Sequence, residues 1–198
     1  MGRQFIFVVE TNKKCQSDWM YIKDTIEHFY AFDRTQVKLS VVYMDGRGNY
    51  EKKEKDVQNL ISQYKAASKK NQSRVIYCFD CDNFDTNAED ENFLKNAKQY
   101  CEENGYGFVW FCRDIEQVYI GKQVEKSKKQ KEAATFKAKK LIMDVNADKL
   151  LQHHYRVSTS NFMKLWINLM NLREVGLSMI DEDTKRHETQ NTKINGII

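Results

Sequence analysis

The stretch RVIYCFDCDNFD, residues 74–85, decides the fold that the rest of the sequence supports. Residues 75–79 form a short apolar run rich in β-branched and aromatic side chains, which predicts a buried strand rather than a helix. The run stops at three carboxylates, Asp80, Asp82 and Asp85. Because side chains at positions i and i+2 of an extended chain point to the same side, Asp80 and Asp82 are expected to converge at the end of the strand. Two such charges repel each other, and a hard divalent cation, Mg²⁺ or Mn²⁺, would offset the repulsion.

A second apolar run, FIFVVE at residues 5–10, ends in the same way, at Glu10. Acidic residues are depleted in strands, so a glutamate at the end of this run indicates a specific role. Open α/β sheets bind their ligands at the carboxyl ends of the strands. We therefore expect Glu10, Asp80 and Asp82 to form one metal site and to carry any catalysis. Glu10 has one alternative role, which is to lie near the N-terminus of the next helix, where the helix dipole favours an acid.

Apolar strands and amphipathic helices alternate along residues 5–120. Each expected strand is a continuous apolar run, and each expected helix carries an apolar stripe with i, i+3/i+4 spacing. This alternation predicts an α/β domain with a mostly parallel, four-stranded sheet flanked by helices. The expected strands are residues 5–10, 37–44, 75–79 and 108–112, and the helices between them cover residues 19–30, 54–69 and 88–103, the first of them capped by Ser17 or Asp18.

The remainder of the chain divides into two parts. Residues 122–182 form a Lys-rich extension that we expect to be helical, with a break near Asn146, and to pack on the α/β domain of residues 1–121. Within it, the apolar face of residues 162–172 suits either that packing or a homodimer contact. Residues 183–198 have almost no apolar side chains and are expected to form a mobile tail.

Three further acids follow strands of the predicted sheet. Asp85 is expected either to reach a second cation or metal-bound water, or to cap the following helix. Asp114 and Glu116 follow the fourth strand, whose end should lie beside the same edge. Glu116 is the preferred metal ligand of the two, because its apolar neighbours are expected to hold that segment against the core.

Charge is unevenly distributed along the chain, although the net charge is only +4. Residues 80–91 contain six acids and no Lys or Arg, whereas residues 122–140 are rich in lysine. A basic surface beside an acidic site would suit a nucleic acid, either DNA or RNA. The alternative is a solvated helix face, and an arginine there would then simply pair with an acid. The residues expected to contact nucleic acid are Arg113, Lys122, Lys126, Lys128 and Lys129.

The sequence lacks the motifs of three classes of enzyme, which argues against each of them. It has no G-x-x-x-x-G-K-[ST] loop of a P-loop NTPase, no G-x-G-x-x-G fingerprint of a dinucleotide enzyme and no G-x-S-x-G elbow of a covalent hydrolase. Cys78 and Cys81 have C-x-x-C spacing, but a zinc site would need further ligands that only His153 and His154 offer. No apolar run approaches the roughly 20 residues that cross a bilayer, so no membrane association is expected. The five cysteines show no disulfide framework, which favours a cytoplasmic location.

The combination of Glu10 in FIFVVE with Asp80 and Asp82 in VIYCFDCD resembles the Toprim domain. That family places a glutamate at the end of its first strand and a D-x-D motif after a later strand of a parallel sheet. The segment CRDIEQVYIG resembles the acidic-hydrophobic motif of the Toprim nucleases of the OLD and RloB-like groups, which are associated with bacterial defence against phage. The resemblance covers about residues 5–120. Toprim proteins often have glycine after the glutamate, where this chain has Thr11.

These observations predict a Mg²⁺- or Mn²⁺-dependent nuclease in which Glu10, Asp80 and Asp82 act on a phosphodiester held by the lysines of residues 122–140. The resemblance further implies a component of an antiviral defence system that acts with a partner protein. Two alternatives stay open. One is a Toprim-like module that binds nucleic acid or a partner without cutting, and the other is an enzyme acting on small phosphate compounds.

Overall fold

The computed structural model describes residues 1–170 and 178–179. Over these residues the main sheet has five strands in the order β3-β1-β4-β5-β6. Neighbouring strands run parallel except β6, which is antiparallel to β5. The predicted α/β class and mostly parallel sheet are confirmed, and β6 is a short addition that the sequence pattern did not indicate. The strands are β1 (Arg3–Val9), β3 (Val37–Tyr43), β4 (Gln72–Asp80), β5 (Gly107–Cys112) and β6 (Thr159–Ser160).

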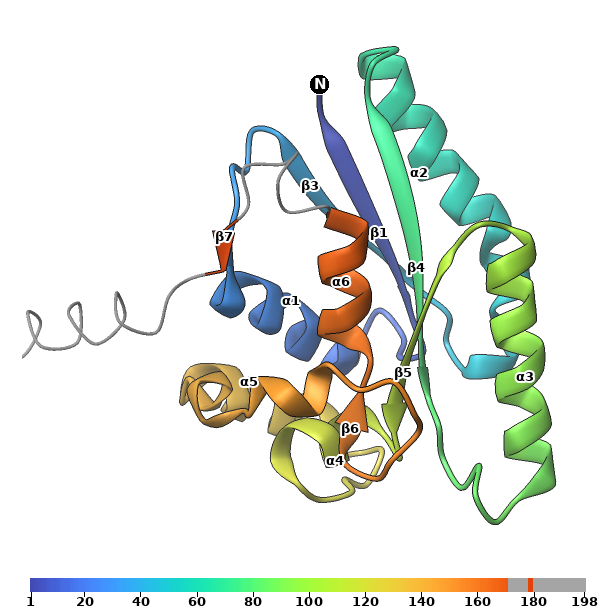
Figure 1. The fold of residues 1–198 in the computed structure, drawn as a ribbon, viewed down its shortest axis with the longest axis vertical. Helices are drawn as coiled ribbons and strands as arrows, with labels where there is room; N and C mark the ends of the chain where they lie inside the picture. The colour runs from blue at the N-terminus through green and yellow to red at the C-terminus, as the bar shows by residue number, and fades with distance from the viewer. Residues whose placement is uncertain (171–177, 180–198) are drawn as a thin grey trace, which may run out of the picture.

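Helices cover both faces of this sheet (Figure 1). One face is covered by α2 (Glu54–Ala67) and α3 (Ala88–Glu103), and the other by α1 (Ser17–Phe29), α4 (Ile115–Ile120), α5 (Lys129–Ala138) and α6 (Phe162–Met170). Short 3₁₀ turns occur at Arg47–Asn49, Glu51–Lys53, Leu141–Asp144 and Ala147–Leu150, and β2 (Tyr30–Ala31) pairs antiparallel with β7 (Ser178–Met179). Within the described part of the chain, no helix has both the length and the apolar character that a membrane span requires.

Side chains of β1 alternate between the two apolar layers. Phe5 and Phe7 point toward the α1 and α6 side, where the ring of Trp166 lies 4.8 and 5.8 Å from theirs. Ile6 and Val8 belong to the layer under α2 and α3. All four strand residues are completely buried, because helices cover both faces. That is why the sequence shows a continuous apolar run instead of an apolar-polar alternation.

The strand register brings the ends of β1 and β4 together. Val9, the last residue of β1, pairs with Cys78 of β4, and Asp80 at the end of β4 pairs with Phe111 of β5. Since these strands are parallel, the residues that follow them emerge at one edge of the sheet. Glu10 and the segment that starts at Asp80 are therefore neighbours in space.

The expected Lys-rich extension packs on the same core as the preceding residues. Phe136 of α5 lies 4.9 Å from the ring of Tyr21 and 5.8 Å from that of Tyr119. The apolar face of α6 also packs inside the chain, with Trp166 only 1% exposed. The extension is less helical than expected, because α5 ends at Ala138 and only two 3₁₀ turns follow it before α6; these turns are separated at Val145 and Asn146, near the expected break. The expected mobile tail, residues 183–198, lies outside the described residues.

Strand β6 covers only the end of β5, and a side chain continues the pairing where it stops. Ser160 and Thr159 pair with Phe111 and Cys112. Next to them, Oδ1 of Asn161 accepts a hydrogen bond from the N–H of Trp110 at 3.0 Å, and its Nδ2 donates to the carbonyl of Phe108 at 2.9 Å. The amide of Asn161 thus satisfies two backbone groups of β5, as a further strand residue would.

Candidate functional site

The candidate site is a cavity of about 830 Å³ at the carboxyl-terminal edge of the sheet. Residues that follow β1 and β4 form one part of its wall, and residues 123–127, 129 and 130 at the start of α5 form another. Carboxylate oxygens are the ligands that Mg²⁺ and Mn²⁺ prefer, and this wall is rich in them. The acids that line the cavity are Glu10, Asp18, Asp45, Asp80, Asp82, Asp114 and Glu125.

A hydrogen bond joins Glu10 to Asp80 across the ends of two neighbouring strands. Oε1 of Glu10 accepts from the backbone N–H of Asp80 at 2.9 Å. Oδ1 of Asp80 in turn accepts from the N–H of Ile115, the first residue of α4, at 3.0 Å. Each carboxylate is thus held through one oxygen, and within the described residues its second oxygen has no backbone partner. The structure brings these two sequence-predicted residues together.

Asp82 lines the same cavity but does not reach it by strand alternation. Strand β4 ends at Asp80, and Asp82 has a left-handed backbone with a φ of 48°. The i, i+2 rule for extended chains therefore does not set the direction of its side chain, and that step of the sequence prediction was wrong. The position of the carboxylate is instead fixed by Arg47, whose Nη1 lies 2.6 Å from Oδ2 of Asp82 and whose Nη2 lies 2.6 Å from Oδ1 of Asp90. The Arg47 guanidinium also stacks 4.6 Å from the ring of Phe93.

Lys129 lies among the acids rather than on an exposed basic face. Its Nζ is 2.7 Å from Oε2 of Glu116 and 3.7 Å from Oδ2 of Asp80. The Lys129 side chain is 18% exposed, and Glu116 is completely buried. Glu116 was expected to serve as a metal ligand and Lys129 to contact nucleic acid. In the structure these two side chains form an ion pair with each other.

Burial and mutual repulsion shift the pKa values of these acids upward. Burial, together with the nearby Asp18 and Asp82, raises the pKa of Glu10 to about 8. Burial and the neighbouring Glu10 and Asp18 also raise the pKa of Asp80 well above its ordinary value. Burial raises the pKa of Glu116 to about 7, although Lys129 opposes that shift. Cations close to the carboxylates would return these pKa values toward their ordinary range.

Asp85 and Arg113 form a separate polar contact. Nη1 of Arg113 donates to Oδ1 of Asn83 at 2.6 Å, and its Nη2 lies 3.5 Å from Oδ2 of Asp85. Neither Arg113 nor Asp85 lines the acidic cavity. Asp85 does not cap α3 either, because the cap is Asn87, whose side chain accepts from the N–H groups of Glu89 and Asp90.

The remaining lysines that were expected to bind nucleic acid occupy different positions. Lys126 lines the acidic cavity. Lys122 is 62% exposed and lies 3.7 Å from Glu132, and Lys128 is 60% exposed and lies 2.8 Å from Glu125. Both exposed lysines are outside the lining of the cavity, and each has an acidic partner.

Sequence reasoning missed Asp18 and Arg47. Asp18 was expected only as a helix cap, but the residue before α1 is Gln16, and no side chain caps that helix. The carboxylate of Asp18 instead reaches back along the chain, where Oδ2 accepts from the N–H of Thr11 at 3.0 Å. Arg47 lies within the polar turn at residues 45–49, where no periodicity marks it as the partner of Asp82.

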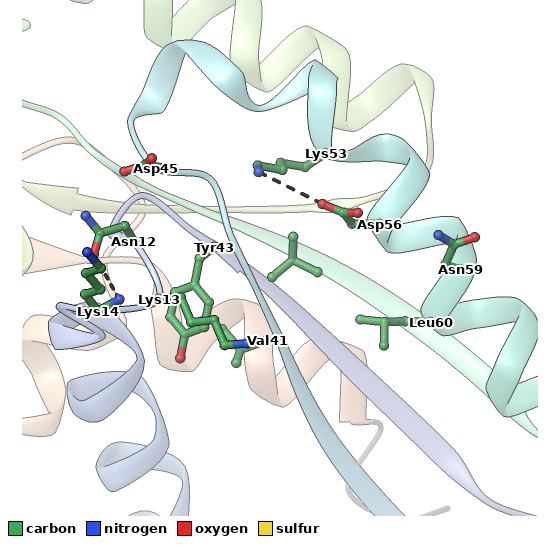
Figure 2. A pocket seen from close by; sticks show the side chains of 11 residues that line it. Asn12, Lys13, Lys14, Val41, Tyr43, Asp45, Lys53, Asp56, Asn59 and Leu60 are labelled. Carbon is green, nitrogen blue, oxygen red and sulfur yellow. Dashed lines mark hydrogen bonds and ion pairs between the residues drawn. The ribbon is translucent and has the colours of Figure 1, made fainter.

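A second hollow, of about 700 Å³, lies beside the acidic cavity between β3, α2 and the loop after β1 (Figure 2). Asn12, Lys14 and Asp45 line both hollows, so the two are adjacent. Figure 2 shows these three residues grouped near one end, with Leu60 of α2 at the other. The cations that line the second hollow are Lys13, Lys14 and Lys53, of which Lys53 lies 4.0 Å from Asp56.

Two acids of the site lie beside the chain's own cations, Asp82 beside Arg47 and Asp80 beside Lys129. Among the described residues, no three His, Cys, Asp or Glu side chains form a ready-made metal-binding group. Cys78 and Cys81 are both buried, with free thiols. Arg47 contacts Oδ2 of Asp82 and Lys129 lies 3.7 Å from Oδ2 of Asp80, so a divalent cation that binds here would share these acids with the chain's own cations.

Comparison with protein-family models, with curated proteins and with solved structures found no match to this chain. The proposals below therefore depend on the residues and the geometry described above.

Proposed function

We propose that this protein is a Mg²⁺- or Mn²⁺-dependent nuclease that hydrolyses phosphodiester bonds, of the type that its Toprim resemblance implies. The observation that carries the proposal is the hydrogen bond between Glu10 and the backbone of Asp80. Two acids that are far apart in the sequence meet at the edge where parallel α/β sheets bind ligands. Both belong to the pattern that resembles the Toprim domain.

The residues at this edge fit a hard divalent cation. Glu10, Asp80 and Asp82 offer carboxylate oxygens to one cavity, and burial raises the pKa of each. Burial is the largest cause of these raised pKa values, and a nearby dication would favour the charged form of each acid. When bound, Mg²⁺ or Mn²⁺ would lower the pKa of a coordinated water and offset negative charge on the phosphate.

Glu10 is suited to accept a proton from the attacking water. Its Oε1 is held by the N–H of Asp80, so Oε2 is the atom that would take the proton. A general base must lie within reach of the proton that it takes, and Glu10 lines the cavity that would hold the cation and its water. The hydrogen bond fixes the carboxylate, which keeps Oε2 in one place while the proton moves.

Lysines around the cavity would hold the phosphate backbone of the substrate. Lys126 lines the acidic cavity, and Lys13, Lys14 and Lys53 line the adjoining hollow. These cations would position a polyanion without reading its sequence. By the Toprim resemblance, we further propose a cytoplasmic role in an antiviral defence system, together with a partner protein.

One observation favours a second candidate, a module that binds nucleic acid without cutting it. Lys129 and Arg47 already neutralise part of the acidic cluster, so the fold does not need a metal ion to hold these acids. In this case the lysines around the two hollows would still bind a polyanion.

The test is cleavage of end-labelled single- and double-stranded DNA and RNA with Mg²⁺, with Mn²⁺ and with EDTA. We expect cleavage with a divalent cation, loss of cleavage in EDTA, and loss of cleavage in Asp80→Asn. Cleavage that persists in Asp80→Asn would overturn the proposed site. Binding without cleavage of any substrate would identify the non-catalytic module.

A further inference from the structure

Lys129 is anchored by the core rather than by its own charge. It is the first residue of α5, and α5 is fixed on the sheet by Ala133 and Phe136, which are 0 and 1% exposed. The ring of Phe136 packs against Tyr21 and Tyr119 at 4.9 and 5.8 Å. This aromatic packing holds the start of α5 beside Asp80 and Glu116, and it thereby positions the Lys129 ammonium group.

The ammonium group lies between two acids that differ in their surroundings. Asp80 also faces Glu10 and the cavity, whereas Glu116 is completely buried. Over the described residues, neither oxygen of Glu116 has a hydrogen bond of normal geometry, and its charge is met by the Lys129 ammonium at 2.7 Å. A buried carboxylate requires a cation or a proton nearby, and here the chain supplies the cation itself.

We propose that Lys129 occupies the place of a second metal ion, so that this acidic site binds one divalent cation and not two. The inference rests on the proposed metal-dependent function and states its metal stoichiometry. Glu10, Asp80 and Asp82 serve the single cation, while Glu116 is committed to Lys129.

Charge and space both support this assignment. Mg²⁺ needs about six oxygens at about 2.1 Å, and the Lys129 nitrogen already lies 2.7 Å from Oε2 of Glu116 and 3.7 Å from Oδ2 of Asp80. A second dication beside this partly buried ammonium group would be repelled by its charge.

The experiment is Mn²⁺ titration followed by calorimetry and by electron paramagnetic resonance, which counts bound ions and detects coupled pairs. The unmodified chain is expected to bind one Mn²⁺. Lys129→Met is expected to bind a second Mn²⁺ beside Glu116. Lys126→Met is the matched control, since Lys126 lines the same cavity without an ion pair to Glu116, and it is expected to bind one.

Two further variants separate this inference from a general effect of charge. Lys129→Met combined with Glu116→Gln removes both partners of the ion pair, and it is expected to return to one Mn²⁺. Glu116→Gln alone leaves Lys129 with Asp80, so Mn²⁺ affinity is expected to fall by about tenfold at a stoichiometry of one. This last variant keeps a polar side chain of the same shape, and it tests the inference even where Lys129→Met does not fold.

Two Mn²⁺ in the unmodified chain would overturn the inference and leave the proposed nuclease function intact. One Mn²⁺ in a folded Lys129→Met variant would do the same, as would an unchanged or higher affinity in Glu116→Gln. Absence of Mn²⁺ binding in the unmodified chain and in every variant would overturn both this inference and the proposed function.

Discussion

Glu10 accepts a hydrogen bond from the backbone of Asp80 at 2.9 Å, although the two residues are 70 positions apart in the chain. The bond links the end of β1 to the end of β4. It also gives the two oxygens of the Glu10 carboxylate different roles. Oε1 fixes the position of the side chain, and we propose that Oε2 accepts the proton.

Glu10→Gln is expected to abolish most nuclease activity without unfolding the protein. The amide oxygen can still accept from Asp80, but the side chain can no longer take a proton or carry negative charge. We expect the cleavage rate to fall by about 100-fold or more, the usual effect of losing a general base. The measurement is single-turnover cleavage at saturating Mn²⁺, with Glu89→Gln in the first turn of α3 as the control. A rate equal to that of the unmodified chain would exclude Glu10 from catalysis.

Stability without metal is expected to fall as the pH rises. The folded-state pKa of Glu10 is raised from 4.5 to about 8, so the folded protein binds this proton more tightly than the unfolded chain. The resulting stabilisation is complete below the unfolded pKa of 4.5 and is lost as the pH rises through about 8. Asp18 and Asp80 have raised pKa values and act in the same direction.

Melting temperatures in EDTA are therefore expected to drop between about pH 5 and pH 8, and Glu10→Gln should flatten this drop. Added Mn²⁺ binds the deprotonated acids, so its stabilising effect should grow over the same range. A melting temperature that stays level in EDTA from pH 5 to pH 8 would contradict the raised pKa values.

The fold class could be predicted because β1, β4 and β5 carry continuous apolar runs whose parallel ends must meet at one edge. The proximity of Glu10 and Asp80 follows from that rule alone. The partners of the acids could not be predicted in this way. Arg47 and Lys129 lie in polar segments without periodicity, and nothing local distinguishes Lys129 from its exposed neighbour Lys128. Strand β6 has only two residues, too few for any alternation to show.

Arg47→Met is expected to destabilise the protein by about 1–3 kcal/mol, a range that allows for the partial exposure of the arginine. It leaves Asp90, which is 5% exposed, without its cation and frees Asp82. Urea unfolding measures the effect. Adding Asp90→Asn should recover part of the loss, because it removes the buried charge. No recovery in the double variant would show that Arg47 acts through its contact with Phe93 instead.

Lys13→Glu with Lys14→Glu is expected to weaken nucleic-acid binding and to reduce its dependence on salt. Each lost phosphate contact lowers the slope of log affinity against log salt by about one. Fluorescence anisotropy with a labelled oligonucleotide gives both quantities. The control is Lys69→Glu with Lys70→Glu, which changes the net charge equally at exposed positions in the turn before β4. Equal losses in the two variants would show a general charge effect and no role for the second hollow.

Asn161→Ala is expected to lower the free energy of unfolding by about 1–3 kcal/mol, because the N–H of Trp110 and the carbonyl of Phe108 lose their partner. Chemical denaturation measures the change. Asn161→Asp is an informative companion, since it keeps the acceptor for Trp110 but removes the donor to Phe108. Stability equal to that of the unmodified chain in both variants would show that water replaces the amide at no cost.

The amide of Asn161 also has a consequence for how copies of this protein meet. An edge strand with unpaired backbone groups can pair with a strand of another molecule and so promote aggregation. Asn161 occupies two such groups of β5, the N–H of Trp110 and the carbonyl of Phe108, where β6 has already ended. On the opposite margin, β3 carries the exposed Lys38, and a charge of this kind discourages the docking of a foreign strand. Both edge strands of this apolar sheet thus carry a feature that disfavours edge-to-edge association between molecules.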